Sequence, residues 1–188
     1  MLYLSKGILC KGSTKEKLCI SRGNNIYTIE GLEAEIWLDG RFKLNTLPDT
    51  LDYEDALLSL CANGLAEFEY QSDAINKFRI LTRCICCPAK SNLFSSVFKQ
   101  KEKNILKWLS LAGIRLTTAE LTYLCENKIS PTDNLIYDEN RQALIETIYT
   151  KSNIFDNILE NQMENAVCRN EITDILMELL RKRKIVML

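Results

Sequence analysis

Nine basic side chains gather in the middle of this sequence, and their type and spacing suit them to binding phosphate. Between residues 76 and 116 a single acid, Glu102, accompanies the cations Lys77, Arg79, Arg83, Lys90, Lys99, Lys101, Lys103, Lys107 and Arg115. Lysine and arginine hold phosphates through charge-assisted hydrogen bonds, and each such contact adds salt-dependent affinity for nucleic acid. The first eight of these cations are therefore predicted to contact nucleic acid, with double-stranded DNA as the expected partner.

The same cations could instead form a solvated helix face that pairs with neighbouring acidic segments. Residues 28–76 hold eleven acids and two basic residues, and residues 116–180 hold twelve acids and four basic residues. The formal net charge of −1 therefore conceals a strong segregation of charge along the chain. The two interpretations differ in whether the fold brings the cations onto one surface.

Three cysteines, Cys84, Cys86 and Cys87, could supply thiolate ligands to a metal ion. A tetrahedral zinc site needs four ligands, and the sequence offers neither a histidine nor a second close cysteine pair. On a strand, Cys84 and Cys86 would share one face while Cys87 points away. We therefore expect no metal site here, and thiols that are inert or mildly redox-sensitive.

The absence of histidine also bears on catalysis. It removes the commonest general base and the usual partner of a nucleophilic serine or cysteine. No glycine-rich phosphate-binding loop is present either. The sequence therefore predicts a non-enzymatic protein without a cofactor.

Composition favours an ordinary globular protein. The chain has 188 residues, of which 46% are hydrophobic, which is enough for one medium domain or two small ones. No apolar run reaches the ~18 residues of a membrane span, and lysines interrupt the N-terminal apolar stretch. Eight cysteines without a secretion signal indicate reduced thiols. We expect a cytoplasmic protein that does not associate with membranes.

The basic segment must be positioned by the elements around it. In the first half, residues 2–29 predict a small antiparallel meander, and residues 31–39 predict a short helix. A second helix is expected over 51–63, capped by Asp52 and ended by Gly64. Alternating apolar residues then predict strands over 65–70 and 78–84.

A polar stretch with a proline, residues 88–96, predicts a boundary between domains 1–88 and 97–188. Beyond it, a helix is expected over 98–112, and Thr117 and Glu120 fit a capping box that opens another. Further helices are predicted over 138–150 and 154–167. A last helix is expected to open at Asn170 and to be followed by an apolar strand at 185–188.

This order of elements resembles the winged-helix family, in which a helix is followed by a two-stranded wing. The pattern occurs over residues 52–84 and, in part, over residues 170–188. The resemblance implies an α+β, helix-rich fold of two tandem winged-helix-like units with a small N-terminal antiparallel sheet. It further implies a transcription-regulator-like, DNA-binding homodimer, with Arg79 or Arg83 reaching a groove from a wing strand.

Residues 3–70 also resemble the PqqD-type peptide-recognition domain. The resemblance is carried by Ile26-Tyr27-Thr28-Ile29, by the run Ala34 to Gly40, and by Leu57, Leu60, Gly64 and Leu65. Such domains take a leader peptide as an added strand, so the resemblance implies a peptide or protein partner. The segment between Gly40 and Asp52 is shorter than in that family, which usually has an extra helix there.

Overall fold

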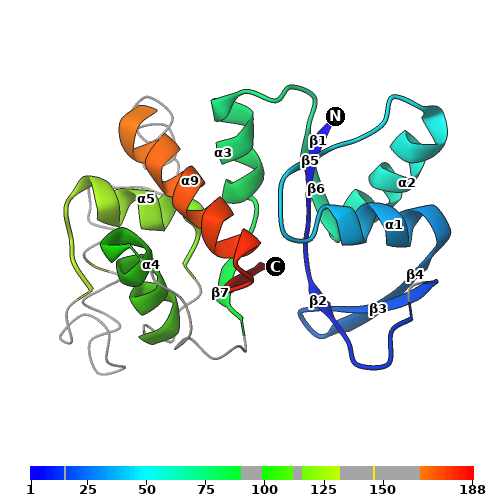
Figure 1. Cartoon of the computed structure of the whole chain (residues 1–188), viewed down its shortest axis with the longest axis horizontal. Coiled ribbons are helices and arrows are strands. Elements are labelled where there is room, and N and C mark those ends of the chain that lie inside the picture. The colour runs from blue at the N-terminus through cyan, green and yellow to red at the C-terminus, as the bar shows by residue number, and fades with distance from the viewer. Residues whose placement is uncertain (15, 90–98, 112–115, 132–145, 147–165) are drawn as a thin grey trace. The chain divides into compact units, whose positions relative to one another are not determined.

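The chain divides into two compact units of mixed α+β structure. The computed structural model describes residues 1–14, 16–89, 99–111, 116–131, 146 and 166–188 (Figure 1). One unit comprises Met1–Cys84 with Val186–Leu188, and the other comprises Ile85–Ile185. The predicted α+β class is confirmed. The expected linker 88–96 lies largely outside the described residues.

Two small antiparallel sheets form the framework of the first unit. One has the order β5-β1-β6 and the other β2-β3-β4. Their bounds are β1 Leu2–Ser5, β2 Ile8–Leu9, β3 Lys17–Arg22, β4 Asn25–Glu30, β5 Asn45–Thr46 and β6 Ala66–Glu69. The predicted meander is confirmed as β2-β3-β4. The strand that the sequence predicts from residue 2 is divided at Gly7, where φ is +105°, into β1 and β2, and β1 belongs to the other sheet.

Helices α1 (Gly31–Asp39) and α2 (Leu51–Ala62) follow the meander, as the apolar spacing predicts. The expected cap of α2 is wrong, because Thr50 occupies the N-cap and Asp52 lies inside the first turn. There Asp52 still complements the positive end of the helix dipole. Gly64 follows the C-cap Asn63 with φ of +68°, a conformation that glycine adopts without strain.

The strand predicted over 78–84 is wrong. Ala74–Thr82 forms helix α3 instead, and the Asp73 carboxylate caps it by accepting a hydrogen bond from Asn76 N at 2.8 Å. The segment is short enough to fit both patterns. Phe78 and Ile80 alternate as on a strand, whereas Phe78 and Leu81 are three residues apart as on a helix, and the Asp73 cap favours the helix. The strand β6 pairs with β1, so residues 65–84 form no wing hairpin.

The core of the first unit forms around Trp37 of α1. Its side chain is fully buried, and its indole Nε1–H donates a 2.9 Å hydrogen bond to the carbonyl of Lys6. Buried neighbours come from both sheets and from α1 and α2; they include Leu18, Ile20, Ile29, Leu57, Leu60 and Leu65. Tryptophan buries a large apolar area while its one donor finds an acceptor, so it fixes α1 against the strands.

The second unit is mainly helical in its described part. Its elements are β7 (Cys86–Pro88), α4 (Gln100–Leu111), α5 (Thr118–Glu126) and α9 (Ala166–Arg181). The boundary with the first unit falls within the last strand, β8 (Ile185–Met187), after Ile185. In the described ranges, no helix is both long and apolar enough to cross a membrane.

The sequence predicts where some of these helices begin, to within a few residues. The predicted capping box is confirmed: Thr117 Oγ1 accepts from Glu120 N at 3.2 Å, and Thr117 N donates to Glu120 Oε2 at 2.6 Å. Helix α9 begins at Ala166, earlier than the predicted start at Asn170. The helix predicted over 138–150 and most of the one predicted over 154–167 lie outside the described residues.

Candidate binding surfaces

The structure divides the central cations between the two units. Lys77 and Arg79 lie on α3, and Arg83 is its C-cap residue, all in the first unit. The expectation that Arg79 and Arg83 extend from a wing strand is therefore wrong. Four other cations belong to the second unit, at α4 or directly before it: Lys99, Lys101, Lys103 and Lys107. Lys90 lies outside the described residues.

Two of the predicted nucleic-acid ligands are already engaged by acids. The Arg83 guanidinium donates to the carboxylate of Glu69 and, at 3.2 Å, to the carbonyl of Phe68. Lys101 Nζ donates to Glu171 of α9, and this hydrogen bond raises the pKa of Lys101. For these two cations the structure matches the interpretation in which the basic segment pairs with acidic segments.

Three lysines, one directly before α4 and two within it, follow helical spacing and share one face. Lys99, Lys103 and Lys107 are four residues apart, so they lie one above the other over two turns. The acid of this segment, Glu102, points elsewhere: it is 3% exposed and receives Lys182 Nζ at 3.0 Å. We call Lys99, Lys103 and Lys107 the α4 lysine face.

Strand β4 is an edge of the β2-β3-β4 sheet. It pairs with β3 over its full length, from Asn25 opposite Arg22 to Glu30 opposite Lys17. In the described part of the chain, no strand pairs with its other side. Ile26 on this strand is 69% exposed. An unpaired edge with an exposed apolar side chain can accept another extended segment.

A hollow of about 580 Å³ adjoins the end of β4. Gly31, which follows β4 directly, lines it together with Glu16, Leu32, Glu35 and Leu38. On α1, Leu32, Glu35 and Leu38 recur three residues apart and so line one side of the helix. Glu35 Oε1 also accepts a 3.2 Å hydrogen bond from the Tyr53 hydroxyl, which raises the pKa of Tyr53. The hollow combines apolar walls with two carboxylates.

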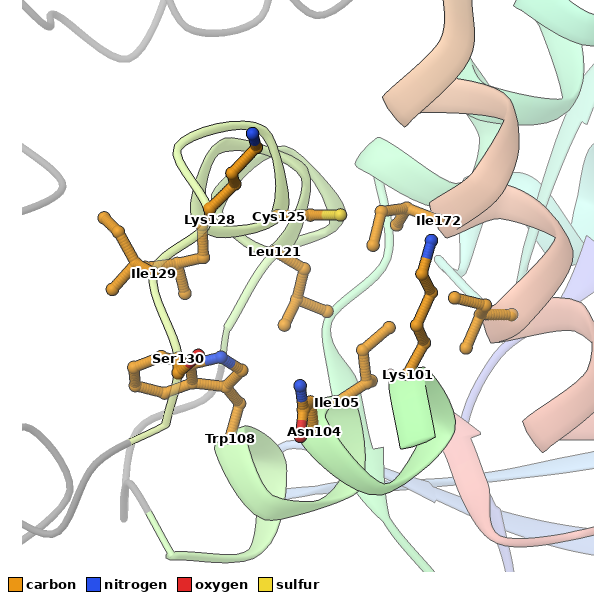
Figure 2. A pocket seen from close by; sticks show the side chains of 12 residues that line it. Lys101, Asn104, Ile105, Trp108, Leu121, Cys125, Lys128, Ile129, Ser130 and Ile172 are labelled. Atoms are coloured by element: carbon orange, nitrogen blue, oxygen red, sulfur yellow. The ribbon is translucent and has the colours of Figure 1, made fainter. Parts of the chain in front are cut away.

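A second cavity, of about 220 Å³, lies among α4, α5 and α9 (Figure 2). Apolar side chains dominate its lining, which also includes Lys101, Lys128 and Cys125. Sequence reasoning identified neither this cavity nor the hollow beside β4. Each is lined by residues from separate elements of the chain. The only local signal in the sequence is the helical spacing of the lining residues within α1 and within α4.

Two of the three clustered cysteines have polar neighbours of their own. Cys84 Sγ donates to the Ile80 carbonyl at 3.2 Å, and Cys86 Sγ lies 3.9 Å from Thr118 Oγ1. Complete burial raises the pKa of Cys86 to about 12, so this thiol stays protonated at neutral pH. Among the residues that the structure describes, no group of three or more Cys, Asp and Glu side chains could hold a metal ion.

The two units thus offer an open strand edge, an acidic hollow, a lysine face and a cavity as surfaces for binding. Comparison of the chain with models of protein families, with curated proteins and with solved structures found no match to any of them.

Proposed function

We propose that this chain is a non-enzymatic adaptor that binds a peptide or protein by adding an extended segment of the partner to strand β4. The observation that carries the proposal is the open edge of β4 beside the hollow of Glu16, Leu32, Glu35 and Leu38. Added strands gain affinity from main-chain hydrogen bonds and specificity from pockets for alternate side chains. The first unit offers both features next to each other.

The core of the first unit supports the resemblance to PqqD-type domains. Seven residues that carry the resemblance meet in one buried cluster: Ile29, Ala34, Ile36, Trp37, Leu57, Leu60 and Leu65. A meander followed by two helices is also the order that the resemblance implies. Where that family usually has another helix, this chain has only the two-residue strand β5.

The chemistry of the hollow indicates what the partner segment should carry. An apolar side chain of the partner can pack against Ile26, which is largely exposed on the edge strand. A lysine or arginine can enter the hollow, because Glu16 and Glu35 provide negative charge beside two leucines. We therefore propose an extended segment with apolar and basic residues in alternation.

The test starts from peptides selected on the immobilised full-length chain from a random display library. A selected peptide should slow hydrogen exchange at the amides of β4. Ile26→Lys should weaken its binding about tenfold, because a lysine on an edge strand opposes pairing and repels a basic segment. Isothermal titration of the synthetic peptide measures the decrease in affinity.

Ile8→Lys provides the matched control. Ile8 is 46% exposed on β2, the opposite edge of the same sheet, so it should leave binding unchanged. Equal decreases for Ile8→Lys and Ile26→Lys would contradict the proposal. Selected peptides that protect no amide of β4 would contradict it as well.

A second proposal is nucleic-acid binding by the α4 lysine face. It keeps the expectation of a transcription-regulator-like homodimer, with the winged-helix-like pattern limited to the closing helix and strand of the chain. Helix α9 followed along the chain by strand β8 is consistent with that pattern. In the described part of the chain, neither Lys99 nor Lys103 forms an ion pair, and both are exposed. Exposed lysines one turn apart can address successive phosphates.

Charge reversal tests this second proposal. The double variant Lys99→Glu, Lys103→Glu should lower affinity for a random DNA duplex. The slope of log affinity against log salt concentration should become shallower by about 0.9 for each phosphate that the variant no longer neutralises. Fluorescence anisotropy over a salt series measures both quantities. The exposed pair Lys11→Glu, Lys43→Glu carries the same charge change and should have a smaller effect. Equal effects would indicate net charge alone.

A further inference from the structure

Two thiols meet where α5 packs against α9 in the second unit. Cys125 lies in the last turn of α5 and lines the 220 Å³ cavity together with Ile172 of α9. In Figure 2 the Cys125 sulfur lies on the side of α5 that faces Ile172. Cys168 precedes Ile172 by four residues on α9, so both side chains lie on the same helix face. The Cys168 thiol is among the neighbours that raise the pKa of Cys125, so the two thiols lie beside each other.

Both cysteines are free and half-buried, so small oxidants can reach them. We propose that Cys125 and Cys168 form a reversible intrachain disulfide when the protein meets a low-molecular-weight disulfide such as oxidised glutathione. The bond would join the end of α5 to the start of α9. The inference is independent of peptide and nucleic-acid binding.

The exchange proceeds in two balanced steps. The Cys168 thiolate attacks one sulfur of oxidised glutathione, whose S–S bond breaks and releases one glutathione thiolate. The Cys125 thiolate then attacks the Cys168 sulfur and expels the second glutathione thiolate. Two protein thiols and one glutathione disulfide become one protein disulfide and two glutathiones, and the protons of the protein thiols pass through solvent to the released thiolates.

The surroundings of Cys125 determine this order. Burial, then the neighbouring Cys168 and Glu171, raise the pKa of Cys125 to about 11, so its thiolate is scarce at neutral pH. A scarce thiolate is a slow first attacker. Once glutathione is bound to Cys168, the adjacent Cys125 attacks within the same molecule. Its high effective concentration there compensates for the small fraction of thiolate.

A second pair of cysteines gives an internal comparison. Cys10 and Cys19 lie opposite each other at the end of the β2-β3 ladder, and Cys10 N donates to the Cys19 carbonyl at 2.8 Å. Their thiols have other neighbours: Cys10 Sγ lies 3.9 Å from the Ile8 carbonyl, and Cys19 Sγ lies 3.9 Å from Thr28 Oγ1. In the first unit, the backbones of Cys10 and Cys19 are therefore adjacent, but each thiol has a different polar neighbour.

The experiment treats the full-length reduced protein with oxidised glutathione at neutral pH, blocks the remaining thiols and maps non-reduced peptides by mass spectrometry. We expect a Cys125–Cys168 crosslinked peptide and a fall in free thiols from eight to six. Reduction with dithiothreitol should restore all eight. Absence of this crosslink in the native protein, or a crosslink between Cys10 and Cys19 alone, would overturn the proposal.

Single substitutions test the order of attack. Cys125→Ser should trap a glutathione adduct on Cys168, whereas Cys168→Ser should leave Cys125 largely unmodified. Cys19→Ser is the matched control in the first unit: its seven thiols should fall to five, with the same crosslink. An adduct that accumulates on Cys125 rather than Cys168 would overturn the assigned order. Circular dichroism of each reduced variant verifies that it is folded.

Discussion

Trp37→Ala should lower the free energy of unfolding of the first unit by about 3 to 5 kcal/mol. The side chain is fully buried among residues of both sheets and of α2, so its removal leaves a large cavity. The substitution also removes the donor to the Lys6 carbonyl, which leaves a buried acceptor without its partner. Urea unfolding followed by far-ultraviolet circular dichroism measures the change.

Two further variants separate the causes of this destabilisation. Trp37→Phe keeps most of the ring volume but removes the indole N–H, so it should cost less, about 1 to 3 kcal/mol. Leu51→Ala changes a residue that is 78% exposed and should stay within about 0.5 kcal/mol of the parent. If Trp37→Ala and Leu51→Ala had equal effects, Trp37 would not be the centre of the core.

The second large effect concerns a buried ion pair. Lys6 is only 2% exposed, and its Nζ donates to Glu67 Oε1 at 2.5 Å. Glu67→Ala should destabilise the first unit by about 3 to 5 kcal/mol, because a buried ammonium loses its counter-charge. Lys6→Met should cost less, since Glu67 is 22% exposed and lies 3.8 Å from Arg83 Nη1.

The double variant Lys6→Met, Glu67→Ala completes a thermodynamic cycle. It should be more stable than Glu67→Ala alone, because removing both charges costs less than leaving one unpaired. The measurement is again urea unfolding at constant pH and ionic strength. Additive effects of the two single variants would show that the pair contributes little to stability.

Sequence patterns predicted those elements whose signals are local. The capping box of Thr117 and Glu120 and the end of α2 at Gly64 each depend on a few adjacent residues. The segment 78–84 was mispredicted because its short apolar pattern fits both periods, and the decisive residue, the cap Asp73, lies outside it. The type of an element could thus be predicted where its signal is local, but not in a short segment whose pattern fits both a helix and a strand.

The basic segment was harder to interpret, because the partners of its charges are distant in sequence. Arg83 pairs with Glu69, and Lys101 pairs with Glu171, 70 residues away. Charge composition indicates an excess of cations but not which of them the fold neutralises. The open edge of β4 was likewise invisible, because strand order in a sheet follows from tertiary pairing rather than from local pattern.

The central position of β1 has a consequence for how the chain is made. Its residues Leu2 to Ser5 are buried and pair with Glu69 to Ala66 of β6. On the ribosome, β1 emerges long before β6 exists, whereas the meander β2-β3-β4 can close as soon as Glu30 has left the exit tunnel. The apolar strand β1 therefore lacks its β6 partner until Glu69 has left the tunnel, and during that interval its side chains are open to non-native contacts.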